Sequence, residues 1–446
     1  MASAGKVRLE AVKILYRVLQ NDAYADILIH ETVKNRSFSY QDRALLYELV
    51  YGTLRWHGRL IYLLSHVYHG HWNRLNKKIQ IVLALGLYQI IYLDRIPDFA
   101  AIHESVQIAR QWGHFRWTGL VNALLRRLSK LHPSIELPDI RKNPVQGIAV
   151  RNSYPEWLVE DWINRHGIER TLSMCRACNE KPVLSVRTNI LMNEPSQLSD
   201  SLHDLGYELI PGEFLREFFT IPEQRGLFET SIFKSGCFTV QDESAGFVSR
   251  LVDPKPDEII FDMAAAPGGK SGHMAELSGN RALILSMDRH YSRLVPLREN
   301  VKRLGYKHVF MIQGDGLNPP VRQVDKVLID APCSGLGTLR KRPELRWKMN
   351  KEKIQELNQI QKQLLQNAVN CCSSDGIIVY STCSVMKQEN QEIAEWFLST
   401  YPEFRIESAV RWNPRAIVNR KGWIETWPDI HRTDGAFAVR FKRGVN

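Results

Sequence analysis

Two cysteines stand just after apolar segments that are predicted to be buried β-strands. Cys333 lies three residues after the segment 327–330, Val-Leu-Ile-Asp, and Cys383 directly follows the segment 379–382, Val-Tyr-Ser-Thr. Because ligands bind at the carboxyl ends of strands in open α/β sheets, both thiols are expected at one cleft. A reducing compartment disfavours a disulfide, and no His or Cys cluster with ligand spacing supports zinc. The pattern favours nucleophilic chemistry by a thiolate.

The loop Asp262–Ser271 is the second chemical motif, with the sequence Asp-Met-Ala-Ala-Ala-Pro-Gly-Gly-Lys-Ser. Its small residues let the backbone approach a ligand where a predicted strand gives way to a helix. It departs from the phosphate-binding loop, because Ala264 occupies the position of the first glycine. Asp288 ends the next predicted strand, where a carboxylate accepts hydrogen bonds from ribose hydroxyls. The pair indicates an adenosine-containing cofactor such as S-adenosylmethionine; a structural turn with a surface Asp is the alternative.

An alternating series of strand-like and helix-like segments from Phe238 onward is predicted to position these motifs. Asp330 ends one of these strands, and Pro332 stiffens the turn that follows it. The series predicts a doubly wound, parallel, Rossmann-like sheet, with the alternating segment 436–441 at an edge. The predicted strands are 258–262, 282–287, 309–312, 325–329, 377–380 and 436–441, and the predicted helices are 270–277, 292–304, 351–371 and 388–398.

The first 130 residues form the predicted helical part of the chain. Apolar residues recur there at helical spacing, and Ser39 followed by Asp42 predicts a capping signal. Residues 1–145 carry 20 basic and 11 acidic side chains. Four of the basic residues are interpreted either as an RNA-facing surface or as solvated helix faces: Arg116, Arg126, Arg127 and Lys130.

A Pro-rich segment, 132–144, separates the helical part from a small acidic α+β piece. The strands predicted in that piece are 182–187 and 207–210. These shifts in composition predict three domains. They are an all-helical domain at 1–145, an α+β connector at 146–235 and the α/β domain at 236–446.

Composition and hydropathy exclude several classes of protein. A chain of 446 residues with 44% hydrophobic and 24% charged residues is neither disordered nor a disulfide scaffold. Its most apolar stretch, 79–93, is shorter than the about 20 residues of a membrane span. No signal segment follows Met1, so a cytoplasmic protein without a membrane partner is expected. The net charge of +11 favours a polyanionic partner.

In its motifs the sequence resembles the Sun/Fmu/RsmB branch of the RNA cytosine-5 methyltransferases. The helical front part resembles the NusB-type RNA-binding domain that this branch carries. The resemblance implies a class I, Rossmann-like methyltransferase domain at 236–446. The matching segments are Asp262–Ser271, Asp288, Gly314–Asp315, Asp330–Gly335, Arg346–Trp347, Thr382–Ser384 and His431–Phe441.

The chemistry of such enzymes explains these residue types. C5 of cytosine is a poor nucleophile, and addition of a thiolate to C6 makes the ring an enamine that attacks the methyl group of S-adenosylmethionine. A base must then remove the C5 proton before the thiolate is eliminated. By the resemblance, Cys383 is the C6 nucleophile and Cys333 assists breakdown of the covalent adduct. Asp330 contacts the target base, and Lys270 is the motif lysine near that site.

The resemblance also implies which residues hold S-adenosylmethionine. Asp288 and Asp315 correspond to the contacts with the ribose and the adenine, and Pro267 and Gly268 to the loop against the methionine part. No metal is predicted. The complete predicted cofactor set is Ala264, Ala265, Ala266, Pro267, Gly268, Gly269, Lys270, Asp288, Arg293, Asp315, Gly316, Asp330 and Pro332.

The function that the resemblance implies is methylation of a cytosine in small-subunit (16S) ribosomal RNA, at position 967, by a monomer. The target base must be unpaired or flipped out of a stem, since a thiolate cannot reach C6 within a stack. Transfer RNA is the alternative substrate, and a non-catalytic RNA-binding or ribosome-assembly factor is the alternative class. DNA cytosine methyltransferases use the cysteine of the Pro-Cys motif and lack the second one, so Cys383 argues against them.

Overall fold

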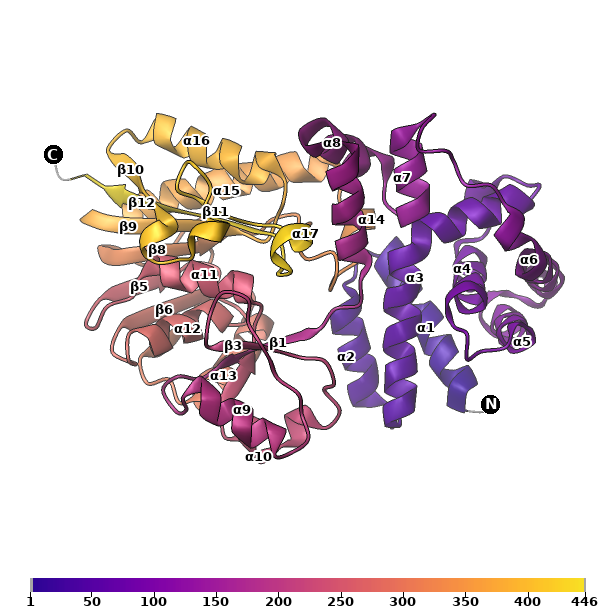
Figure 1. Cartoon of the computed structure of the whole chain (residues 1–446), viewed down its shortest axis with the longest axis horizontal. Helices are drawn as coiled ribbons and strands as arrows, with labels where there is room; N and C mark the ends of the chain where they lie inside the picture. Colours follow the sequence, from indigo (N-terminus) through magenta and orange to yellow (C-terminus); the bar gives the residue numbers. More distant parts are fainter. Residues whose placement is uncertain (1–2, 445–446) are drawn as a thin grey trace. The chain divides into compact units, whose positions relative to one another are not determined.

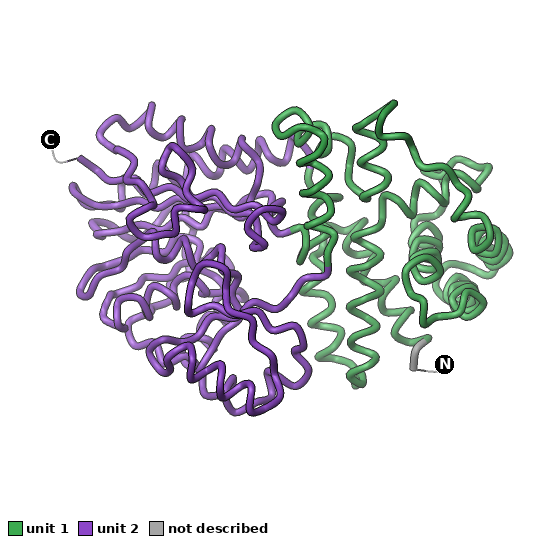
Figure 2. The backbone as a smooth tube through the Cα atoms, in the orientation of Figure 1, with its two compact units in different colours: residues 1–180, 339–349 green, residues 181–338, 350–446 purple. Residues whose placement is uncertain are grey.

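The computed structural model describes residues 3–444 (Figure 1). The chain folds into two compact units. The first unit contains the residues up to Glu180 and the segment Leu339–Met349. The second contains Lys181–Thr338 and the residues from Asn350 onward; Figure 2 gives each unit its own colour. The domain boundaries predicted near residues 145 and 235 stay a prediction.

The first unit is helical, as the sequence predicts. Ser39 begins the longest helix with a capping box, in which its hydroxyl accepts from the backbone N–H of Asp42 and the Asp42 carboxylate accepts from the Ser39 backbone. In the part that the structure describes, no helix is both long and apolar enough to cross a membrane. The helices are α1 (Ser3–Gln20), α2 (Ala25–Asn35), α3 (Tyr40–Val67), α4 (Lys77–Tyr92), α5 (Asp98–Ile108), α6 (Thr118–Leu131), α7 (Pro144–Asn152), α8 (Glu156–Asn179) and α14 (Leu345–Lys348).

The segment Leu339–Met349 is far in sequence from the rest of the first unit but is built into its interior. Arg346 is fully buried, and its guanidinium donates to the carbonyl of Ser153 at 3.0 Å and to Asn179 Oδ1 at 2.9 Å. Trp347 donates its indole N–H to the carbonyl of Leu54 at 2.7 Å. Buried polar groups need such partners, so these eleven residues complete the first unit.

The second unit begins with a small antiparallel sheet of strand order β2-β3-β1-β4. The strand predicted at 182–187 is present, and a strand expected to begin near Cys237 lies at 238–240. The strand predicted at 207–210 starts only at its last residue, and the strand at 218–221 was not predicted. The short apolar runs of those strands lack the length that makes a pattern distinctive. The elements are β1 (Leu184–Thr188), α9 (Pro195–His203), β2 (Ile210–Pro211), β3 (Phe218–Ile221), α10 (Ser231–Lys234) and β4 (Phe238–Val240).

The larger sheet has strand order β10-β12-β9-β8-β5-β6-β7, with β11 paired to β12. The pairs formed among strands β5 to β9 are all parallel, as predicted. Strand β12 pairs antiparallel with β9, β10 and β11. The strands are β5 (Ile259–Asp262), β6 (Leu283–Asp288), β7 (Val309–Gln313), β8 (Val324–Asp330), β9 (Cys372–Thr382), β10 (Phe404–Glu407), β11 (Ile424–Thr426) and β12 (Ala436–Arg443). The helices are α11 (Glu243–Val252), α12 (Gly269–Leu277), α13 (Tyr291–Leu304), α15 (Lys351–Cys371), α16 (Gln391–Thr400) and α17 (Pro428–His431).

Helices cover both faces of this sheet (Figure 1). Neighbouring residues of one strand point to opposite faces, so Phe261 packs with α15 and α16 while Ile260 packs with α11 and α12. The same split separates Val327 from Leu328 on the next strand. Burial on both faces explains the continuous apolar runs of these strands, and the sheet is doubly wound as predicted.

The segment 436–441 was predicted as an edge strand, and this prediction is wrong. It forms β12, which lies between β9 and β10 and pairs antiparallel with both. All of its first six residues are buried, including Arg440, whose guanidinium donates to Glu407 and to backbone carbonyls of α11. The alternating pattern suggested an edge, but here Arg440 is paired inside the fold.

Candidate active site

The carboxyl ends of β5, β6, β8 and β9 meet at one edge of the sheet, because these strands are parallel neighbours. Asp330 pairs with Ser381 in the strand register, so the ends of β8 and β9 lie side by side. The four residues predicted to be catalytic lie at these strand ends or in the segments that follow them. They are Lys270, Asp330, Cys333 and Cys383.

The two cysteine sulfurs lie 3.4 Å apart as free thiols. Cys383 is exposed, and Cys333 is half-buried. The hydrogen bond to Cys383 raises the pKa of the Cys333 thiol well above its usual value, and burial adds to this effect. This shift favours the protonated form of Cys333, in which its S–H can donate to the sulfur of Cys383 and would stabilise a thiolate there.

Lys270 and Asp330 form an ion pair beside the cysteines. Lys270 Nζ lies 2.5 Å from Asp330 Oδ2, and Ser381 Oγ donates to Asp330 Oδ1 at 3.0 Å. Burial alone would lower the pKa of Lys270, but the Asp330 carboxylate, and after it the charge that Cys383 carries when ionised, raises it above its ordinary value. The lysine is thus held as a cation next to the exposed sulfur, with the carboxylate oriented by two donors.

Asp262 is buried at the end of β5, beneath the predicted cofactor loop. Its Oδ2 accepts from Ser271 Oγ at 2.6 Å, and Ser286 Oγ lies 3.0 Å from that hydroxyl. Burial raises the pKa of Asp262 to about 7, and the negative charge of Asp330 contributes in the same direction. The folded chain therefore binds this proton more tightly than an ordinary aspartate does, and losing the proton costs the folded chain stability.

Replacement of Asp262 by Asn should change how stability depends on pH. The folded chain binds the Asp262 proton more tightly than the unfolded chain, so wild-type stability falls as pH rises from about 4 to about 7. Asp262→Asn removes this dependence and should be more stable than wild type at pH 8, by about 4 kcal/mol at most. Urea unfolding across pH 4–8 measures this, with the exposed Asp375→Asn as control. Parallel pH profiles of wild type and Asp262→Asn contradict the prediction.

The loop Ala264–Gly268 closely approaches its neighbours. Gly268 has φ +97°, and a Cβ at this position would lie 2.8 Å from Leu297 Cγ, so only glycine fits without a shift. The carbonyl of Ala266 accepts from Arg293 Nη2 at 3.2 Å, which ties the loop to α13. Gly269 begins α12, where free backbone N–H groups face the loop. Small residues and open N–H groups fit the close backbone approach expected for S-adenosylmethionine.

Asp288 ends β6 with its side chain nearly buried, at 4% exposure. Its Oδ1 accepts from the backbone N–H of His290 at 2.9 Å, and its Oδ2 lies 3.5 Å from Arg293 Nη1. A carboxylate has about four acceptor sites, so these two partners leave room for the two ribose hydroxyls of a nucleoside. The residues present therefore fit the predicted cofactor.

Asp288→Ala should weaken the binding of S-adenosylmethionine. Removal of two charge-assisted hydrogen bonds to ribose predicts a loss of about 10- to 100-fold in affinity. Isothermal titration calorimetry with the cofactor alone measures this loss, without any RNA. Asp375→Ala, an exposed aspartate near the other end of β9, is the matched control. An unchanged dissociation constant for Asp288→Ala would remove this residue from the predicted site.

The other predicted cofactor contacts lie on neighbouring loops at the same edge. Asp315 follows β7, is partly exposed and lies 3.6 Å from Arg289 Nε. A Cβ on Gly316 would approach Leu364 to 2.6 Å, so the chain passes close to α15 there. The carbonyl of Pro332 accepts from Gln361 Nε2 at 3.0 Å. All the residues predicted to hold the cofactor therefore lie at the edge formed by β5 to β8, and their individual roles remain predictions.

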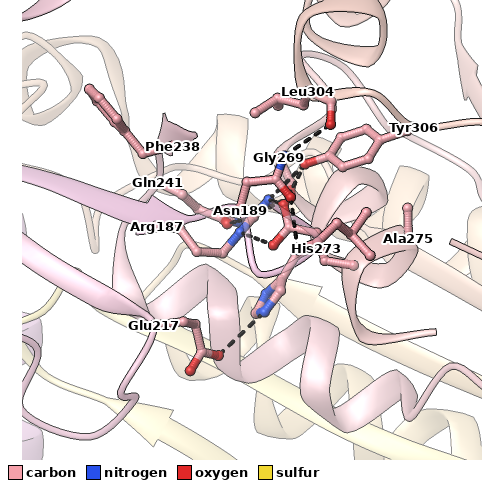
Figure 3. A network of polar contacts seen from close by, with 12 residues as sticks. Arg187, Asn189, Glu217, Phe238, Gln241, Gly269, His273, Ala275, Leu304 and Tyr306 are labelled. Atoms are coloured by element: carbon pink, nitrogen blue, oxygen red, sulfur yellow. Dashed lines mark hydrogen bonds and ion pairs between the residues drawn. The ribbon is translucent and has the colours of Figure 1, made fainter. Parts of the chain in front are cut away.

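A buried arginine of the small sheet supports this edge and was not predicted. Arg187 of β1 donates to Glu276 at 2.7 Å, to the hydroxyl of Tyr306, to Gln241 and to the carbonyl of Gly269 at 3.0 Å. Figure 3 shows Arg187 directed at the first turn of α12 from the neighbouring sheet. Its partners lie far away in sequence, so no local pattern marks it. The contact fixes the backbone directly before Lys270.

Three family models match consecutive parts of the chain. The model described as 16S rRNA methyltransferase RsmB/F matches residues 249–442. The NusB family model matches residues 5–130, and the ferredoxin-like domain of RsmF/B-like methyltransferases matches residues 154–225. These matches confirm the predicted fold class: a NusB-like helical front, a small α+β connector and a Rossmann-like methyltransferase domain.

Similar proteins cover nearly the whole chain. The probable ribosomal RNA small subunit methyltransferase B of Bacillus subtilis is 33% identical over 446 residues, or 98% of each chain. The ribosomal RNA small subunit methyltransferase B of Yersinia pseudotuberculosis is 30% identical over 91% of this chain and 93% of its own. Among solved structures, PH0851 is 26% identical with a TM-score of 0.83, covering 99% of each chain. A methyltransferase homologue from Pyrococcus horikoshii is 26% identical with a TM-score of 0.58, covering 68% of this chain and 99% of its own.

Proposed function

The chain belongs to the RsmB/F family of 16S rRNA methyltransferases, and from this membership we propose that it methylates C5 of a cytosine in 16S rRNA. In this proposal a covalent bond between Cys383 and C6 of the base activates C5. The observation that carries the proposal is the pair of sulfurs 3.4 Å apart, one exposed and one held as a thiol, beside an ion-paired lysine.

Each residue at the sheet edge has a role in the proposed chemistry. Cys383 attacks C6 with its exposed sulfur, which Cys333 and Lys270 stabilise in the charged form. Asp330, fixed by Lys270 and Ser381, faces the edge of the base and offsets the charge that develops on the ring. Cys333 then assists release of the product from the covalent adduct.

S-adenosylmethionine supplies the electrophilic methyl group when it is bound. The chain binds its ribose through Asp288, whose carboxylate retains free acceptor sites. Asp315 would contact the adenine, and the loop Ala264–Gly268 would hold the methionine part. This assignment places the cofactor beside the end of β8, where Asp330 begins the loop of Cys333.

The RNA substrate is assigned to the helical part as well as to the sheet edge. Arg116, Arg126, Arg127 and Lys130 are exposed in the structure. In the proposed RNA-binding domain, residues 1–145, these side chains form a basic surface that binds RNA phosphates. The target cytosine must be unpaired or flipped out, because Cys383 can reach C6 only from outside a stack. We further propose that the chain acts as a monomer.

Purified chain, labelled S-adenosylmethionine and small-subunit rRNA test the proposal. The expected product is 5-methylcytosine, detected by nucleoside analysis and placed by bisulfite sequencing, with cytosine 967 as the specific expectation. Labelled transfer RNA in the same assay would instead support the alternative substrate. Methylation at another atom of the base contradicts the proposed chemistry, and binding of rRNA without any methyl transfer contradicts the assignment as an enzyme.

A further inference from the structure

The carboxylate of Glu389 is fully buried and is not used in the chemistry described above. It lies on a short 3-10 turn, Lys387–Glu389, that follows the loop of Cys383. Tyr380 of β9 donates its hydroxyl to the backbone carbonyl of Glu389 at 2.7 Å. The backbone of Glu389 is therefore tied to the strand that precedes Cys383.

The oxygens of this carboxylate accept hydrogen bonds from both cysteine loops. Glu389 Oε1 accepts from the backbone N–H of Ser334 at 2.7 Å and from Gln361 Nε2 at 3.3 Å. Glu389 Oε2 accepts from the hydroxyls of Ser334 and Ser384, each at 2.5 Å. The two hydroxyls are themselves 3.1 Å apart. Four donors thus converge on one buried carboxylate, as a buried charge requires.

The two serines that donate to this carboxylate are the neighbours in sequence of the two cysteines. Ser334 directly follows Cys333, and Ser384 directly follows Cys383. Their loops leave different strands, so the sheet alone does not set the distance between the two sulfurs. The carboxylate bonds to the residue after each cysteine and therefore fixes both loops relative to each other.

We propose that Glu389 is a positioning residue that holds the sulfurs of Cys333 and Cys383 in contact. It acts through Ser334 and Ser384, and none of the described hydrogen bonds of its carboxylate goes to a sulfur. The importance of this contact for methyl transfer rests on the proposed cytosine-5 chemistry. The geometric part does not, because the distance between the sulfurs is a property of the chain alone.

Glu389→Gln tests the proposal with little change in shape. The amide replaces one carboxylate oxygen with an N–H₂ donor, so it cannot accept both from the two serine hydroxyls and from the backbone N–H of Ser334. Controlled oxidation of the full chain with diamide reports on the contact, because two sulfurs at 3.4 Å need little movement to form a disulfide. The expected result is about tenfold slower formation of the Cys333–Cys383 disulfide, measured by peptide mass spectrometry after quenching.

The matched control is Glu395→Gln on α16, which makes the same chemical change on an exposed residue paired only with Lys421 among its described contacts. It should oxidise at the wild-type rate. Wild-type oxidation of Glu389→Gln overturns the proposal. If Glu389→Gln fails to fold, as judged by its thermal transition, Ser334→Ala takes its place, because it removes one hydroxyl donor; wild-type oxidation of that variant also overturns the proposal.

Turnover provides the second measurement. Glu389→Gln should lower kcat for methyl transfer by about 100-fold with KM for S-adenosylmethionine within about twofold, since displaced sulfurs slow the chemistry and not cofactor binding. Glu389→Asp, which keeps the charge, should recover part of kcat. An equal loss in both variants together with raised KM contradicts a positioning role. If wild type forms no 5-methylcytosine while the oxidation rates still differ as predicted, the proposed function fails and the positioning role of Glu389 stands.

Discussion

The Cys383→Ala variant should transfer no measurable methyl group to RNA, a loss of about 10⁴-fold or more. Without the covalent bond to C6, C5 of cytosine stays a poor nucleophile, and no neighbouring group replaces the missing step. A loss of this size corresponds to about 5.5 kcal/mol of transition-state stabilisation. Cys333 is not expected to substitute, because it is half-buried and burial raises the pKa of its thiol even when the hydrogen bond to Cys383 is lost. Transfer of label from S-adenosylmethionine to rRNA measures the effect.

Two further variants make this experiment specific. Cys237→Ala removes a partly exposed thiol near the start of β4, which the proposal gives no role, and should keep wild-type activity. Cofactor affinity of Cys383→Ala, measured by calorimetry, should also equal that of wild type. Retained turnover by Cys383→Ala contradicts its assignment as the nucleophile.

The Cys333→Ala variant should accumulate a covalent complex between protein and RNA. In this variant Cys383 still attacks C6, but release of the methylated base lacks the assistance of the second thiol. The complex should survive denaturing electrophoresis and migrate as a shifted band. Under single-turnover conditions this band should contain most of the protein. Wild type should show little of this band.

The contact between the two sulfurs gives a physical reason why Cys383 attacks C6 and Cys333 assists release. The hydrogen bond to Cys383 is the main cause of the raised pKa of Cys333. When Cys383 bonds to C6, its negative charge disappears and this cause is removed, so the pKa of Cys333 should fall. Cys333 can then lose its proton to solvent more readily, so a thiolate able to accept the C5 proton forms only after the adduct. The distance of 3.4 Å between the sulfurs couples the protonation of Cys333 to the state of Cys383.

The double variant Cys333→Ala/Cys383→Ala is the control for the covalent complex. It should give no shifted band, because the attacking sulfur is missing. A band of equal intensity in the double variant would mean that another residue forms the bond. Absence of the band in Cys333→Ala, with methyl transfer at the wild-type rate, contradicts a role of Cys333 in release.

The residues at the sheet edge were predictable because each follows an apolar strand. A buried parallel strand has a continuous apolar run, and the polar residue after that run must lie at the carboxyl edge. Asp262, Asp288, Asp330 and Cys383 follow such runs, and the structure places all of them at or directly after strand ends. Their approximate positions therefore follow from the local sequence and one rule of topology.

Residues that act across the fold were not predictable in this way. Arg187 reaches Glu276 across 89 positions, and Glu389 reaches Ser334 across 55. Each contact depends on which strands are neighbours, and strand order is a property of the whole chain. The same reason explains the error at β12, because an alternating pattern does not tell an internal antiparallel strand from an edge when a buried arginine is paired.

The segment Leu339–Met349 has a consequence for the order of events during synthesis. A ribosome that has translated the first 180 residues must still add 158 more, residues 181 to 338, before this segment appears. Until then the carbonyls of Ser153 and Leu54 lack the donors that Arg346 and Trp347 later supply. Domains usually mature from the amino terminus as the chain emerges. Here the first part of the chain to be made is completed only after most of the second part has been translated.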